Sequence, residues 1–295
     1  MGRGRRASTA AIATAALAVL ASPLVAMDWP LAPPRIAATF GTGAKGRLVT
    51  GLALSAEDGQ VRSAEDGEIS FSIEEGGNPS GLPMPLGSFL VVEHQKGMAA
   101  VYSHLAPGSS SARLAGVKAG DIIGRTGSSG WADGPGLLFE VFDRRADSWV
   151  NPLLVLPSLA ADKAPVIRSL ALSRGDKSII LGSGTSVSQG TYLVSADVVD
   201  PADSAWTAGA LAPYAIRLTI DGVEAASLVF DMARGTEGKL MLFSDRPRAA
   251  DELMTKEGRY SLIERLFPRG RSSLEVRVED AAGNKRTASW SLSVE

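Results

Sequence analysis

The stretch Gly134-Pro135-Gly136-Leu137-Leu138-Phe139-Glu140 decides the fold of the first half of this 295-residue chain. It acts together with further short segments that follow one another in a defined order between Trp29 and Pro157. These segments are Trp29-Pro30-Leu31, Thr39-Phe40-Gly41, residues 48–54, Asp66-Gly67-Glu68-Ile69, residues 87–94, Tyr102-Ser103-His104-Leu105, residues 117–124, Thr126-Gly127 and Asn151-Pro152.

Taken together, these segments resemble zinc peptidases of the lysostaphin/LytM type, secreted bacterial enzymes that cleave peptide cross-links in peptidoglycan. In that family the deciding stretch reads G-P-H-L-H-F-E, where the second His binds zinc and the first assists catalysis. Gly136 and Leu138 stand at these two positions here. The family's other two zinc ligands come from F-H-R-G-I-D-I, which corresponds to residues 48–54, and Val49 and Ala53 occupy the ligand positions.

The resemblance implies an antiparallel β peptidase fold for residues 27–157. It also makes His104, within Tyr102-Ser103-His104-Leu105, the surviving member of the family's active-site set. His104 could still form a hydrogen bond to a ligand in the former substrate groove, or it could be a vestigial strand histidine with a structural role only. We favour the second interpretation.

Zinc chemistry leads to the same conclusion as the family comparison. A catalytic zinc needs about three protein ligands from His, Cys, Asp or Glu and an open water position. The chain has no Cys and two His, His94 and His104. We expect His94 to be a polar turn residue near the surface. A rebuilt site with both imidazoles and a carboxylate would need a matching strand register. Although the family binds zinc, we therefore expect this chain to bind neither zinc nor another cofactor. We also expect no metal-assisted catalysis.

Trp131 lies in the glycine-rich loop immediately before the deciding stretch. A tryptophan displayed beside an apolar groove is a plausible binding hot spot. The competing reading is that it folds over Leu138 and Val49 and plugs the cleft. The candidate partner surface therefore consists of Val49, His104, Trp131 and Leu138, and residues 74–87 form a further wall or lid.

The N-terminus has the pattern of a secretory signal peptide over residues 1–26. Arg3, Arg5 and Arg6 precede an apolar run, which ends at small residues before Met27. The run is shorter than the ~20 residues that a membrane span needs, so we expect no span in the mature chain and a location in the periplasm or envelope of a bacterium. The absence of Cys excludes disulfides and lipid attachment through Cys.

Charge argues against nucleic acid as a partner. The leader holds three of the 30 Lys and Arg residues and none of the 32 Asp and Glu residues, so the remainder has a formal charge of −5. Binding to a phosphate backbone needs a basic face, and the sequence shows none.

A proline-bracketed linker at residues 158–165 separates the peptidase-like domain from a second domain at 166–295. Short alternating patterns there predict an immunoglobulin-like β-sandwich, interrupted by a short helix at residues 248–257. The predicted strands are residues 166–172, 178–181, 191–199, 215–220, 226–230, 240–243, 273–278 and 289–294.

Several Asp residues lie at the ends of these predicted strands. They could bind calcium, but we favour the interpretation that they form turns. These residues are Asp197, Asp200, Asp203, Asp221, Asp231 and Asp280.

The sequence thus predicts an all-β, secreted cell-envelope pseudo-peptidase of the LytM type. We expect it to lack zinc ligands and to bind or regulate peptidoglycan or wall hydrolases. One alternative is a passive envelope module with a structural or adhesive role. The other is an active zinc endopeptidase that acts on peptidoglycan cross-links.

Overall fold

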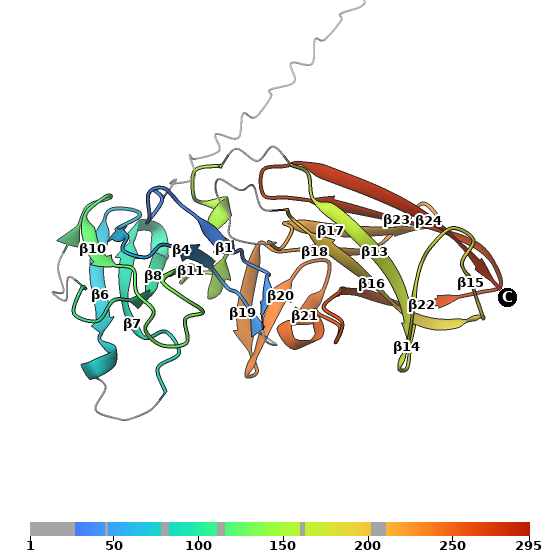
Figure 1. The fold of residues 1–295 in the computed structure, drawn as a ribbon, viewed down its shortest axis with the longest axis horizontal. Coiled ribbons are helices and arrows are strands. Elements are labelled where there is room, and N and C mark those ends of the chain that lie inside the picture. Colours follow the sequence, from blue (N-terminus) through green and yellow to red (C-terminus); the bar gives the residue numbers. More distant parts are fainter. Residues whose placement is uncertain (1–26, 45–46, 78–82, 111–115, 160–162, 202–210) are drawn as a thin grey trace, which may run out of the picture.

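The computed structural model describes residues 27–44, 47–77, 83–110, 116–159, 163–201 and 211–295. Two β-rich halves follow one another along its long axis (Figure 1). Short 3-10 turns occur at Glu75–Gly77 (η1), Gln95–Gly97 (η2), Pro152–Leu154 (η3) and Ala250–Glu252 (η4). Over these ranges, no helix has the length and apolar character required to cross a membrane. The expected leader, residues 1–26, lies outside the described residues.

The first half is built on an antiparallel meander of β6 (Gly67–Ile73), β7 (Ser88–His94), β8 (Met98–Leu105) and β11 (Gly136–Asp143). Buried and half-exposed side chains alternate along β7, because successive side chains of a strand point to opposite faces of the sheet. One face packs on a core that contains Tyr102 and Phe139, whose ring centroids lie 5.3 Å apart.

Shorter strands complete this half. β4 (Leu52–Ser55) pairs with β11 and also with β1 (Ile36–Ala38). The others are β2 (Gly43–Ala44), β3 (Arg47–Leu48), β5 (Gln60–Arg62), β9 (Gly116–Val117), β10 (Ile122–Arg125) and β12 (Ser148–Val150).

The second half contains two sheets around a second core. One sheet has the order β14 (Lys177–Ile180), β13 (Val166–Arg174), β16 (Gly190–Val199), β22 (Tyr260–Phe267). The other has the order β15 (Ser186–Val187), β24 (Lys285–Val294), β23 (Gly270–Glu279), β17 (Ala215–Ile220), β18 (Val223–Val229), with β15 parallel to β24. Both sheets contribute to the same core. The immunoglobulin-like assignment and the exact domain limits stay predictions.

Three strands of the second half leave the sandwich and extend the sheet of the first half. β19 (Met232–Thr236), β20 (Lys239–Phe243) and β21 (Pro247–Ala249) form a meander, and β19 pairs with β12 through Trp149↔Ala233 and Val150↔Met232. The resulting sheet path runs β21-β20-β19-β12-β11-β8-β7-β6-β9. Figure 1 shows β19 to β21 between the two halves.

This junction corrects two expectations. Residues 240–243 form a strand, but it belongs to the sheet of the first half and not to the sandwich. Residues 248–257 do not form the predicted helix; they comprise the end of β21, η4 and an irregular segment. Composition favoured a helix there, whereas pairing of Ala249 with Met241 and burial of Leu253 hold the backbone otherwise. Tertiary contacts override a weak local propensity.

Candidate functional site

The two family ligand positions on β4 and β11 face each other across adjacent strands. Ala53 is directly opposite Leu138, and Gly136 is opposite Ser55. Directly opposed residues of an antiparallel pair have Cβ atoms about 5 Å apart on the same face. The backbone therefore places side chains at 53 and 138 side by side, but an alanine and a leucine occupy these positions.

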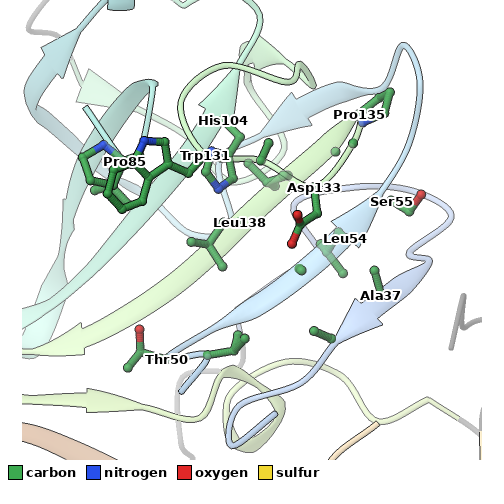
Figure 2. Close-up of a pocket in the computed structure, with 18 of the residues that line it drawn as sticks. Ala37, Thr50, Leu54, Ser55, Pro85, His104, Trp131, Asp133, Pro135 and Leu138 are labelled. Atoms are coloured by element: carbon green, nitrogen blue, oxygen red, sulfur yellow. The ribbon is translucent and has the colours of Figure 1, made fainter. Parts of the chain in front are cut away.

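These residues line a groove of about 800 Å³ (Figure 2). Val49, Ala53, Gly136, Leu138, His104 and Trp131 all belong to its lining, so the structure brings together the residues that the sequence analysis selected. The other lining residues are Ala37, Ala38, Leu48, Thr50, Leu54, Ser55, Pro85, Leu86, Ala132, Asp133, Gly134, Pro135 and Leu137. Pro85 and Leu86 make the expected loop a wall of the groove; residues 78–82 of that loop lie outside the described residues.

His104 is held in one orientation by its backbone and by its ring. Its φ of 66° lies in the left-handed region, where His, Asn and Asp are the commonest residues apart from glycine. Its backbone N–H donates to the Leu86 carbonyl at 2.9 Å, and its Nδ1 lies 2.9 Å from the Ser129 carbonyl oxygen. Burial lowers the pKa of the imidazole below its usual range, so the neutral form predominates at neutral pH.

His94 lies far from this groove along the strands. It ends β7 at the turn, whereas His104 is near the opposite end of the β7–β8 hairpin. The two imidazoles therefore do not meet, which removes the rebuilt site that would use both. The expectation that His94 is near the surface was also wrong. Its ring is buried, with Nδ1 3.1 Å from the Asp66 carbonyl oxygen.

Trp131 forms a wall of the groove rather than a plug. It is 52% exposed, and its backbone N–H donates to the Pro85 carbonyl at 3.0 Å. The preceding Ser129 accepts from the Ser88 N–H at 2.9 Å and donates to the Leu105 carbonyl at 2.7 Å. Ser129 thus fixes both the Trp131 loop and the His104 ring, a role without a signal in the sequence.

Glu140 is a second residue whose role the sequence did not reveal. It ends the deciding stretch, is 5% exposed and accepts a hydrogen bond from the Thr50 hydroxyl beside the groove. Burial raises the pKa of its carboxyl. Gly51 makes room for it, because a Cβ at position 51 would lie 2.6 Å from Glu140 Cγ.

The second half of the chain supports one wall of the groove. Leu48 lines the groove, yet its side chain belongs to the core of the second half, as does that of Phe40. Gly41, with a φ of 90°, packs so closely on the Phe230 ring that a Cβ would lie 2.3 Å from it. Thr39 adds a reciprocal pair of hydrogen bonds, donating to the Ala212 carbonyl at 3.3 Å and accepting from the Ala212 N–H at 3.1 Å.

Two of the Asp residues at strand ends, Asp221 and Asp280, act as turn formers, whereas Asp197 lies within β16 and forms an ion pair with Arg168. Asp280 accepts from the N–H groups of Ala282 and Asn284 at 2.9 and 2.8 Å, and Asp221 accepts from the Ser273 N–H at 2.7 Å. Asp203 lies outside the described residues.

The donor set of the groove does not fit a catalytic zinc. Val49, Ala53 and Leu138 provide no lone pair, which leaves His104 as the sole imidazole in the described lining. Across the described ranges, no three His, Cys, Asp or Glu residues are grouped closely enough to hold a metal ion. A divalent ion beside valine and leucine would have nothing to replace its hydration shell.

Comparison with known proteins identifies the first half. Residues 47–152 match the model of Peptidase family M23, and a separate family model without a functional description matches residues 164–295. The DD-carboxypeptidase/endopeptidase Mpg of Neisseria meningitidis is 34% identical over 145 residues, which cover 46% of this chain and 31% of Mpg. The cell division protein DipM of Caulobacter vibrioides is 32% identical over 162 residues, covering 52% of this chain and 25% of DipM.

Solved structures are similar over the same region. The catalytic domain of EnpA from Enterococcus faecalis has 25% identity and a TM-score of 0.35, covering 41% of this chain and 90% of that domain. The SpoIIQ–SpoIIIAH pore-forming complex contains a chain with 20% identity and a TM-score of 0.37, covering 45% of this chain and 92% of that one. This protein spans less than a third of the length of Mpg and DipM. Its residues 47–152 form a peptidase M23 domain of the LytM type.

Proposed function

We propose that this protein is a cell-envelope pseudo-peptidase whose former substrate groove binds a partner, either peptidoglycan or a wall hydrolase. The observation that carries the proposal is the pairing of Ala53 with Leu138 at two family ligand positions inside an open groove. Such a groove is open to a ligand, but these two positions cannot hold a metal ion that would act as a Lewis acid. Similarity to Mpg, named as a DD-carboxypeptidase/endopeptidase, and to DipM, named as a cell division protein, supports a role at the cell envelope.

Peptide hydrolysis has no chemical route through the described groove. A metallopeptidase needs a metal that polarises the scissile carbonyl and lowers the pKa of its bound water. His104 alone could move a proton but could not generate a nucleophile strong enough to attack an amide. We therefore place no residue of the chain in a catalytic role.

The proposal favours a binding role over a passive envelope module because the groove remains accessible. If the groove had only lost its metal ligands without gaining a binding role, we would not expect Trp131 to be 52% exposed beside Pro85, His104 and Leu138. Exposed aromatic anchors next to an apolar cleft are typical of binding hot spots. Export would follow from the signal-peptide pattern of residues 1–26, and fractionation of a tagged full-length chain tests it.

The decisive experiment measures zinc content and binding on residues 27–295. Elemental analysis after zinc incubation should give far less than one zinc per chain, and a peptidoglycan turbidity assay should show no clearing. One zinc per chain with clearing would overturn the proposal in favour of an active peptidase.

Trp131→Ala tests the groove as a binding surface. Sedimentation with purified sacculi and pull-down of wall hydrolases should both be compared with wild type, and the relevant interaction should weaken by about 2 kcal/mol or more. Phe71→Ala is the matched control, because Phe71 is a similarly exposed aromatic, 47%, that does not line the groove. Equal binding by both variants would support the passive module instead.

A further inference from the structure

Two polar side chains of the groove, those of His104 and Thr50, direct their hydrogens away from it. A carbonyl oxygen can only accept, so the contact between His104 Nδ1 and the Ser129 carbonyl places the ring proton on Nδ1. The other nitrogen, Nε2, then carries a lone pair. It has no hydrogen-bond partner among the described residues, and it is not enclosed as His94 Nε2 is. Figure 2 shows the His104 ring among the lining side chains, near Trp131 and Leu138.

Thr50 repeats this polarity on the opposite wall. Its hydroxyl hydrogen is donated to the buried Glu140 carboxylate, so its oxygen can offer only lone pairs to the groove. A ligand that enters the groove thus meets acceptors at His104 and Thr50.

The charge of the lining points in the same direction. Among the described lining residues there is no Lys or Arg, and the single carboxylate is that of Asp133. A ligand carboxylate would lose part of its hydration without gaining a cationic side chain as a partner. Most of the remaining lining is apolar, from Val49, Ala53 and Leu138 to Trp131 and Pro85.

We infer that the groove binds an apolar protein segment that donates an N–H or O–H group to His104 Nε2, and that it disfavours carboxylate-bearing peptidoglycan peptides. This inference rests on the proposed binding function and narrows its partner to a protein. The orientation of the imidazole selects a donor, while the apolar walls select the neighbouring side chains. A neutral or basic segment fits the lining, and an acidic segment does not.

His104→Asn isolates the Nε2 acceptor from the structural role of His104. Asn tolerates the left-handed backbone at this position, and its side-chain amide can still donate to the Ser129 carbonyl from near the Nδ1 position. It places nothing where Nε2 was. We expect the urea midpoint of unfolding of His104→Asn to equal that of wild type. The side chain of His104→Gln reaches the Nε2 position, so this variant should bind more tightly than His104→Asn.

The probe is a library of random twelve-residue peptides displayed on phage and selected on immobilised residues 27–295. Enriched peptides should be apolar and neutral or basic, and synthetic copies should bind His104→Asn about tenfold more weakly, the effect of one well-placed hydrogen bond. Each donor of the peptide is then removed in turn, by N-methylation in the backbone and by alanine in the side chains. One removal should weaken binding to wild type and have no further effect on His104→Asn, because only a shared hydrogen bond gives that coupling.

Each contrary outcome has a defined meaning. Acidic enriched peptides, or equal affinity of wild type and His104→Asn, would overturn the inference while leaving a groove that binds. Binding of sacculi that depends on Trp131, without any selected peptide, would overturn it in favour of peptidoglycan. Peptides whose binding is unaffected by both Trp131→Ala and Leu138→Asp would show that the groove is not the binding surface, and the proposed function would then fall as well.

Discussion

The groove and the junction between the two halves use their residues in opposite ways. In the junction, backbone and side-chain groups are paired: β12 pairs with β19, and Asn151 donates to the Phe230 carbonyl at 2.8 Å. In the groove, apolar side chains remain accessible, and His104 Nε2 has no hydrogen-bond partner among the described residues. The junction therefore contributes to the stability of the fold, whereas the groove leaves apolar surface accessible, as the proposed binding role requires.

Restoring the ligands tests the groove side of the comparison most strongly. Val49→His, Ala53→Asp and Leu138→His together should convert a groove without a donor set into a zinc site, because the backbone already sets positions 53 and 138 opposite each other. The gain in zinc binding free energy should be on the order of 10 kcal/mol. Isothermal titration with zinc measures it, with wild type and the double variant lacking Leu138→His as controls. Failure of the triple variant to bind zinc would mean that the three positions do not converge as the family comparison implies.

Phe230→Ala tests the junction side. Phe230 is fully buried, packs on Gly41 and lies with its ring centroid 5.5 Å from that of Tyr260. Its truncation should lower the free energy of unfolding by about 3–5 kcal/mol, because it leaves a cavity in the core that both halves share. Urea denaturation followed by tryptophan fluorescence measures the loss. A loss as small as that of exposed Phe71→Ala would contradict the importance of the junction.

Asn151→Ala removes a polar contact of the junction and should have a smaller effect. The Asn151 amide donates to the Phe230 carbonyl, and its oxygen accepts from the Leu153 N–H at 3.1 Å. Leaving both backbone groups unpaired in a buried place costs about 1–3 kcal/mol, again measured by urea denaturation. An effect below about 0.5 kcal/mol would show that water replaces the amide.

Glu140→Gln should produce the smallest effect, visible as a change with pH. Burial raises the pKa of Glu140 above its usual value of 4.5, so the folded protein holds this proton at pH values where the unfolded chain has released it. The associated stability is present below pH 4.5 and is lost as pH rises through the folded pKa. The slope of this loss cannot exceed about 1.4 kcal/mol per pH unit for one group.

The Gln variant stays neutral at every pH and should lack this contribution. Its stability relative to wild type should therefore increase with pH, measured by urea denaturation from pH 4 to about pH 8. A constant difference across this range would show that Glu140 stays equally protonated in the folded and unfolded states.

Much of the first half and the members of its groove were predictable from sequence. Strand patterns and their order identify the M23 domain, and Val49, Ala53, Gly136 and Leu138 are assigned by their places in two short motifs. The roles of Ser129 and Glu140 were not predictable, because they depend on hydrogen bonds to Ser88, Leu105 and Thr50 from other strands and loops.

By itself, the sequence determined that the family motifs are present and that their metal ligands are absent, because these are properties of residue identity and local spacing. Only the tertiary structure decided that β19 to β21 join the sheet of the first half, and that Leu48 packs in the core of the second while lining the groove. The physical reason is that an alternating pattern specifies which face of a strand is buried, whereas the edge with which that strand pairs depends on free backbone groups brought close by the rest of the fold.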